Sequence, residues 1–240
     1  MSQHGVNGSA TAATRSTQAS AYCPVGDGRE IGDVSDVLRR QTASVNVPAS
    51  LTSVDFMRTT AAWAEGLARA LLAGSLPRRW SHVQGVAARA RTLKPSLGPD
   101  ADLIEAAAWL HDIGYLPELA GTGLHGLDGA RYLRDVQHAD PMLCRLVAHH
   151  SCVIVEAEER DLADVLRGEF EPPSQPLADA LTCCDMTTSP DGEPMNVDRR
   201  LAEIHHRYGS GNLVSRSIRR ATPMILNAVG QMHARAASTS

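Results

Sequence analysis

The chain has 240 residues, of which 43% are apolar and 4% aromatic, and its formal net charge at pH 7 is −4. These values are typical of a globular protein and give no electrostatic reason to expect binding to bulk nucleic acid. The 5 cysteines include no C-x-x-C pair, so neither a disulfide framework nor a zinc ribbon is indicated. No apolar run is long enough to span a bilayer, and the polar N-terminus lacks the apolar core of a secretory signal. We therefore expect a cytoplasmic protein with no membrane contact.

Residues 1–50 differ in composition from the rest of the chain. They are rich in Ser, Thr, Ala, Gly and Gln and contain few apolar clusters. Such a segment buries too little apolar surface to offset the entropy lost on folding, so we predict a disordered tail. The pattern changes after this point, and residues 51–235 are predicted to form a single helical domain.

Apolar residues at helical spacing, separated by Pro and Gly breaks, predict about eight helices in this domain. The predicted helical segments, in chain order, are 54–74, 78–93, 101–112, a segment that carries Ala130 and Val136, 142–150, 155–166, 177–184, 197–208 and 213–234. Asp140 and Pro141 have the residue types that favour an N-cap and a first helical position. Because no alternating strand pattern of useful length is present, the predicted fold class is all-α.

The third predicted helix ends in an adjacent pair of polar residues, His111 and Asp112. Leu103, Ala107 and Leu110 recur at helical spacing and are expected to face the core, which places this pair at a buried helix end. Gly114 follows, at a position where a left-handed backbone often ends a helix. A buried charge is costly unless it is paired or bound to a metal, and an Asp at a helix C-terminus also opposes the helix dipole. A divalent cation would compensate both effects.

Further residues with metal-binding side chains occur near predicted helix ends or inward faces. The candidate ligands, in chain order, are His82, His111, Asp112, His125, His149 and Asp185. Imidazole and carboxylate groups suit one or two divalent first-row transition metals. These side chains do not identify the metal, which we expect to be iron, manganese, cobalt, nickel or zinc.

This ordered set resembles the H…HD…D signature of the HD-domain superfamily of metal-dependent phosphohydrolases. His82, His111-Asp112 and Asp185 match that signature, and His125 and His149 match the two additional histidines of its dinuclear members. The resemblance covers roughly Arg78 to Asp191 and implies a compact helical HD-domain fold. The sequence reads His-Asp-Ile-Gly-Tyr where the cyclic-di-GMP phosphodiesterase branch has Lys after the glycine, so that activity is not expected.

The resemblance implies the roles of the ligands. His82, His111, Asp112 and Asp185 would hold a first metal, and His125 and His149 a second, with Asp112 able to bridge them. His150 is a neighbour that could replace His149 or contact a substrate phosphate, but we favour His149 because the first member of the family's histidine pair usually ligates. We therefore expect Asp112, His125 and His149 to be catalytic in the attack of metal-activated hydroxide on a phosphate ester or anhydride.

The expected partner is a small phosphorylated molecule, for which the family favours a nucleotide. Candidate phosphate-binding residues are His150, Arg79 and Arg131, and further arginines occur at Arg78, Arg216, Arg219 and Arg220. Two alternatives stay open, an HD-fold di-iron oxygenase and a metal-binding regulatory module with little turnover. The sequence does not indicate an oligomeric state.

Overall fold

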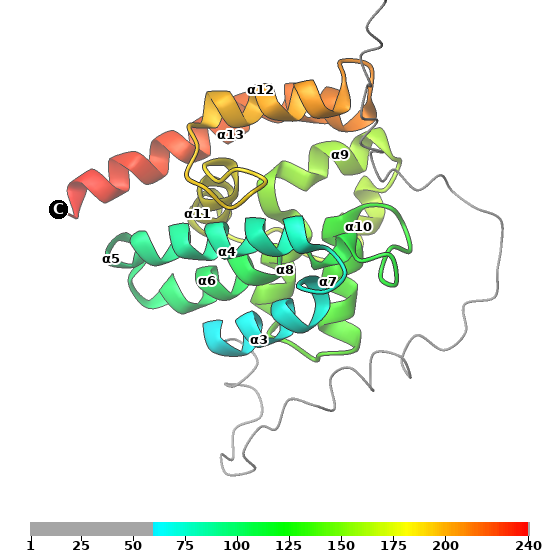
Figure 1. Ribbon diagram of the computed structural model, residues 1–240, viewed down its shortest axis with the longest axis horizontal. Helices are drawn as coiled ribbons and strands as arrows, with labels where there is room; N and C mark the ends of the chain where they lie inside the picture. Colours follow the sequence, from blue (N-terminus) through cyan, green and yellow to red (C-terminus); the bar gives the residue numbers. More distant parts are fainter. Residues whose placement is uncertain (1–59, 240) are drawn as a thin grey trace, which may run out of the picture. The chain divides into compact units, whose positions relative to one another are not determined.

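The structure is a computed structural model that describes residues 60–239. Its helices are α3 (Ala61–Leu72), α4 (Pro77–Thr92), α5 (Lys94–Leu97), α6 (Ala101–Leu110), α7 (His125–Asp135), α8 (Pro141–His149), α9 (Val153–Glu159), α10 (Ala163–Glu169), α11 (Gln175–Met186), α12 (Val197–Tyr208) and α13 (Leu213–Ser238) (Figure 1). Three 3-10 turns join them: η1 (Gly98–Asp100), η2 (Ile113–Tyr115) and η3 (His150–Cys152). Extended pairing within residues 60–239 is limited to an isolated bridge between Thr188 and Pro194.

The all-α prediction is therefore confirmed for the described part of the chain. The predicted tail, residues 1–50, and the predicted start of the domain at residue 51 lie outside the described residues. Among residues 60–239, no helix is both long and apolar enough to cross a bilayer.

Side-chain caps fix the starts of several helices. Thr60 Oγ1 accepts a hydrogen bond from the Trp63 amide at 3.3 Å, and Asp140 Oδ1 accepts one from the Met142 amide at 2.7 Å. Asn196 and Asn212 cap α12 and α13 in the same way, each through its side-chain oxygen. Each cap satisfies an amide that has no partner inside the helix, so these boundaries are set by local sequence.

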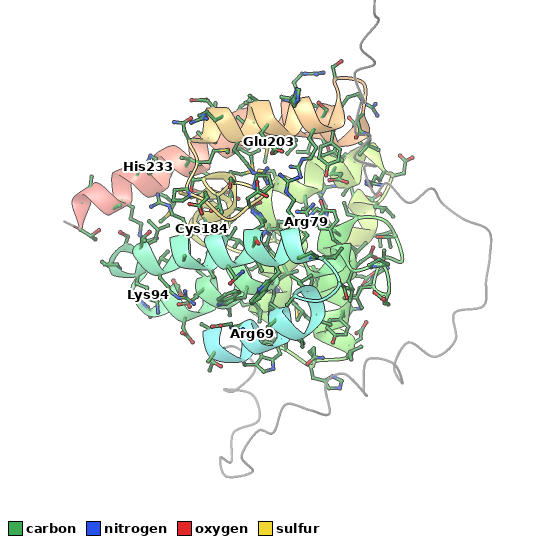
Figure 2. All side chains as sticks on the ribbon, viewed as in Figure 1. Arg69, Arg79, Lys94, Cys184, Glu203 and His233 are labelled. Atoms are coloured by element: carbon green, nitrogen blue, oxygen red, sulfur yellow. The ribbon has the colours of Figure 1, made fainter. Side chains whose placement is uncertain are left out.

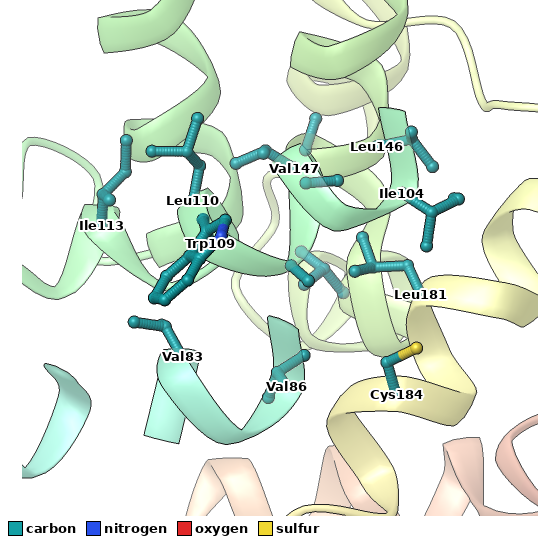
Figure 3. Packing of buried hydrophobic residues seen from close by; sticks show 14 of the residues in the cluster. Val83, Val86, Ile104, Trp109, Leu110, Ile113, Leu146, Val147, Leu181 and Cys184 are labelled. Carbon is teal, nitrogen blue, oxygen red and sulfur yellow. The ribbon is translucent and has the colours of Figure 1, made fainter. Parts of the chain in front are cut away.

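The alanine-rich helix α6 lies at the centre of the fold and contacts α3, α4, α8 and α11. Ala106, Ala107 and Ala108 are completely buried, and their small side chains allow the neighbouring helices to approach closely. Figure 3 shows apolar side chains from α4, α6, α8 and α11 packed in one cluster that includes Trp109. His111, the residue that follows α6, is consequently held deep in the core.

Gly114 does not adopt the left-handed backbone that we expected. It is required instead by the packing of η2 against α7, because a Cβ atom at this position would lie 1.9 Å from the His125 carbonyl oxygen. The glycine thus permits the start of α7, with His125, to lie against the turn that follows Asp112.

The region after α8 differs from the predicted helix over residues 155–166. The structure has two helices there, α9 and α10, and Asp161 between them has a positive φ of 57°. The turn η3, which precedes α9, contains two further residues with positive φ, Ser151 at 46° and Cys152 at 62°. L-residues rarely adopt this conformation, which here follows directly after His150 and separates α8 from α9.

Candidate metal centre

Three helices bring a first group of ligands together. His82 comes from α4, His111 and Asp112 follow α6, and Asp185 lies near the end of α11. His82 Nε2 lies 3.0 Å from Asp185 Oδ1 and 3.9 Å from Asp112 Oδ2, while His111 Nε2 lies 3.6 Å from Asp112 Oδ2. All of these residues are buried. The donor atoms of His82, His111 and Asp112 lie within 4.8 Å of one another, close enough to share one metal ion.

A second group forms on the other carboxylate oxygen of Asp112. His125 Nε2, at the start of α7, lies 3.7 Å from Asp112 Oδ1, and His150 Nε2, at the start of η3, lies 3.9 Å from it. The two imidazole nitrogens are 3.0 Å apart. These three donor atoms also lie within 4.8 Å of one another, so Asp112 belongs to both groups.

The structure corrects the choice between the two adjacent histidines. His149 does not lie in the cluster, because its Nε2 hydrogen-bonds to the Phe170 carbonyl at 2.7 Å. His150 occupies the expected position in its place. Helix α8 ends at His149, and successive side chains at a helix end point in different directions. The positive-φ residues of η3 then keep His150 against Asp112.

Backbone carbonyls orient three of the four clustered histidines. The Nδ1–H groups of His82, His111 and His150 donate to the carbonyls of Ser189 (2.9 Å), Ala108 (2.9 Å) and Val147 (2.7 Å). Carbonyl oxygens only accept hydrogen bonds, so these Nδ1 atoms carry the proton and each Nε2 presents a lone pair to the cluster. Metal-binding histidines are commonly held in this way.

These lone pairs provide a test of whether the residues fit a metal ion. His111 Nε2 is buried and has no hydrogen-bond partner within residues 60–239. His82 Nε2 faces the Asp185 carboxylate across 3.0 Å, an approach of two electron-rich atoms that requires a proton or a metal ion between them. The donor set of imidazoles and carboxylates suits divalent transition metals. The residues therefore fit a metal centre.

Arg79 is the cation closest to this centre. Its Nη1 donates to Asp112 Oδ2 at 2.5 Å, and its guanidinium lies 3.7 Å from the centre of the Tyr115 ring. Tyr115 in turn stacks on His125 with ring centres 4.0 Å apart. Although burial opposes the charged form of both partners, the Asp112–Arg79 attraction raises the pKa of Arg79 and holds that of Asp112 well below its usual range.

For the imidazoles, burial favours the neutral form. It lowers the pKa of His111 to about 4 and that of His125 well below its usual range. For Asp185, burial opposes ionisation, but the close approach of His82 and the positive charge of Arg200 keep its pKa well below its usual range. Ser151 Oγ also donates to Asp185 Oδ2. Neutral imidazoles beside ionised carboxylates are the protonation states that metal ligands need.

A cavity of about 80 Å³ opens over the cluster. Arg79 lines it, as do His150 and Asp185, whereas Arg131 does not. The lining also includes residues that we did not predict, notably Arg200, Arg207 and Tyr208 on α12 and Glu156 on α9. Arg200 and Arg207 are seven positions apart, which places both on one face of a helix. This spacing is the feature of the sequence that could have identified them as a pair.

Four of the other arginines considered for phosphate binding form ion pairs with glutamate or aspartate side chains. Arg131 pairs with Glu169 at 2.5 Å, and Arg220 pairs with Glu158 at 2.6 Å. Arg216 pairs with Glu159 at 3.2 Å, and Arg78 with Asp191 at 2.8 Å. None of these arginines lines the cavity over the cluster, and neither does Arg219.

Comparison with known proteins agrees with this arrangement. Residues 79–186 match the family model described as HD domain. This segment is an HD domain. It runs from Arg79 to Met186 and contains every clustered histidine and aspartate. No curated protein and no solved structure matches the chain. Helices α12 and α13 lie outside the matched HD domain, although both contribute to the cavity wall.

Proposed function

We propose that this protein is a metal-dependent phosphohydrolase that hydrolyses a phosphate ester or anhydride of a small molecule, and that nucleotides are the first substrate class to test. The observation that carries the proposal is that Asp112 belongs to both groups of candidate metal ligands. Its Oδ2 faces His82 and His111, and its Oδ1 faces His125 and His150. A carboxylate shared in this way suits a pair of divalent ions.

Each candidate ion would have its own set of protein ligands. The first would be held by His82, His111, Asp112 and Asp185, and the second by Asp112, His125 and His150. When bound, such ions lower the pKa of a water molecule and stabilise the charge on phosphoryl oxygens. The buried position of the ligands, held by backbone carbonyls, keeps their donor atoms fixed before substrate arrives.

Arg79 would bind the reacting phosphate. A guanidinium has five N–H donors, and within residues 60–239 only Nη1 of Arg79 is hydrogen-bonded, to Asp112. The Asp112 carboxylate and the Tyr115 ring hold the planar group at the cavity wall. Its remaining donors are therefore available to an anionic substrate, and arginine suits bidentate contact with phosphate oxygens.

The experiment starts from protein stripped with a chelator and then loaded separately with Fe²⁺, Mn²⁺, Co²⁺, Ni²⁺ or Zn²⁺. Elemental analysis gives the metal content, and phosphate release is followed for nucleotides and for simple phosphate esters. We expect about two ions per chain and metal-dependent phosphate release. Asp112→Ala should lose both ions and the activity. His206→Ala, which changes an exposed histidine on α12, should retain both.

Three outcomes would contradict the proposal. Failure to bind any of the metals would refute the metal centre. Oxygen consumption by the iron-loaded protein, without phosphate release, would identify an oxygenase. Metal binding without turnover of any phosphate substrate or oxygen would indicate a regulatory module.

A further inference from the structure

Helix α12 supplies two arginines to the wall of the cavity, and the proposed hydrolysis uses neither. Arg200 and Arg207 lie on the same face of α12, outside the matched HD domain. Figure 2 labels Arg79 on α4 and Glu203 on α12. These two helices supply the three arginines that line the cavity in the described part of the chain, Arg79 from α4 and the other two from α12. The cavity is therefore cationic at the α12 wall as well as at Arg79.

Arg200 is buried more deeply than a charged side chain normally is. It is 5% exposed, and its Nη1 donates to Glu203 Oε2 at 2.5 Å. Its Nε is buried and has no hydrogen-bond partner within residues 60–239. An unpaired buried donor is destabilising, and more so on a charged group. A ligand anion in the cavity would supply the missing acceptor.

Arg207 shares the same counter-ion. Its Nη2 donates to Glu203 Oε2 at 3.0 Å, and its guanidinium lies 5.1 Å from the centre of the Tyr208 ring. One carboxylate thus holds two guanidinium groups, which leaves one positive charge without a partner in this group. The cavity-lining Glu156 does not offset this charge, because it is paired with Arg160 at 2.7 Å.

Building on the proposed hydrolase function, we propose that Arg200 and Arg207 bind a second anionic group of the substrate. The substrate then carries a phosphate that reacts at the metal centre and, at the other end of a small molecule, a phosphate or carboxylate that binds at α12. The same cavity is lined by the candidate metal ligands and by both α12 arginines, so one bound molecule can contact both. Glu203 positions the two guanidinium groups and does not itself contact the anion.

The experiment measures binding with phosphonates, which are not hydrolysed. Isothermal titration calorimetry measures the dissociation constants of propylphosphonate, propane-1,3-diylbisphosphonate and 4-phosphonobutanoate. Each compound is titrated into chelator-stripped and into Mn²⁺-loaded protein. We expect at least one of the two compounds that carry two separate anionic groups to bind about tenfold more tightly than propylphosphonate, which carries one. Preference for the bisphosphonate assigns the second group as phosphate, and preference for the phosphonobutanoate assigns it as carboxylate.

Three variants decide whether α12 causes this preference. Arg200→Met and Arg207→Met should each abolish it, whereas Arg199→Met, which makes the same change at an exposed neighbouring position, should retain it. Arg207 is 27% exposed in its side chain, so its variant decides the matter if Arg200→Met fails to fold. Equal binding of all three compounds by the unmodified protein, or an undiminished preference in Arg207→Met, would overturn the proposal. Because phosphonates report binding alone, a protein without phosphohydrolase activity still gives a clear result.

Discussion

Arg79 Nη1 donates a 2.5 Å hydrogen bond to Asp112 Oδ2, the oxygen of Asp112 that also faces His82 and His111. The guanidinium therefore links the cavity wall to the candidate metal centre. The same contact neutralises a buried carboxylate when no metal is bound, which explains how the cluster can form in the folded chain.

Arg79→Met tests the proposed phosphate contact. The variant should retain its bound metal, because Arg79 is not a ligand, but its kcat/KM for phosphate release should fall by about 10- to 100-fold through loss of a charged hydrogen bond. The measurement is steady-state kinetics on metal-loaded protein. Arg131→Met is the control, since Arg131 pairs with Glu169 outside the cavity, and it should retain full activity. Equal losses in both variants would show that Arg79 has no special role.

The adjacent histidines make a matched pair of variants. His150→Ala removes a donor atom of the second group and should reduce the metal content from about two ions per chain to about one. His149→Ala should retain both ions, because its imidazole bonds to the Phe170 carbonyl away from the cluster. Elemental analysis after dialysis measures the difference. Loss of metal in His149→Ala alone would restore our original choice of ligand.

Two glycines test how the fold positions His125. In Gly114→Ala the new Cβ would lie 1.9 Å from the His125 carbonyl oxygen, so η2 and α7 would have to separate. We expect a loss of about 2 kcal/mol or more in the free energy of unfolding. Gly66→Ala is the control, because it adds a methyl group to α3 that meets no atom within 4 Å beyond the adjoining helix backbone, and it should stabilise the protein by about 0.5–1 kcal/mol. Urea denaturation measures both, and a neutral Gly114→Ala would contradict the close packing described above.

The metal-free protein should lose stability in mildly acidic solution. Burial lowers the pKa of His111 from 6.5 to about 4, so between these values the unfolded chain binds a proton that the folded chain does not. The free energy of unfolding therefore falls as the pH falls from 6.5 towards 4, and His125 contributes in the same direction. Denaturation of chelator-stripped protein at several pH values measures the slope. His111→Gln should flatten it, while a slope as steep as that of the unmodified protein would refute this cause.

The sequence carried most of the information on the helices and on the types of ligand. Caps such as Asp140 and Asn196 act on amides two or three residues away, so they can be recognised locally. The break after α9, inside the predicted helix over residues 155–166, was not predicted, and neither was the left-handed backbone of η3. They depend on positive φ at Ser151, Cys152 and Asp161, residue types that do not by themselves signal this conformation.

By itself, the sequence determined an all-α chain with an ordered set of histidines and aspartates, because helical periodicity and residue chemistry are local properties. Only the tertiary structure decided which side chains meet. His82 and Asp185 are 103 positions apart but lie 3.0 Å from each other, since α4 and α11 pack together. His150 joins the cluster in place of His149 because the chain turns after α8, and Arg200 and Arg207 reach the cavity because α12 packs over it. Such contacts follow from the packing of whole helices, which no short stretch of sequence specifies.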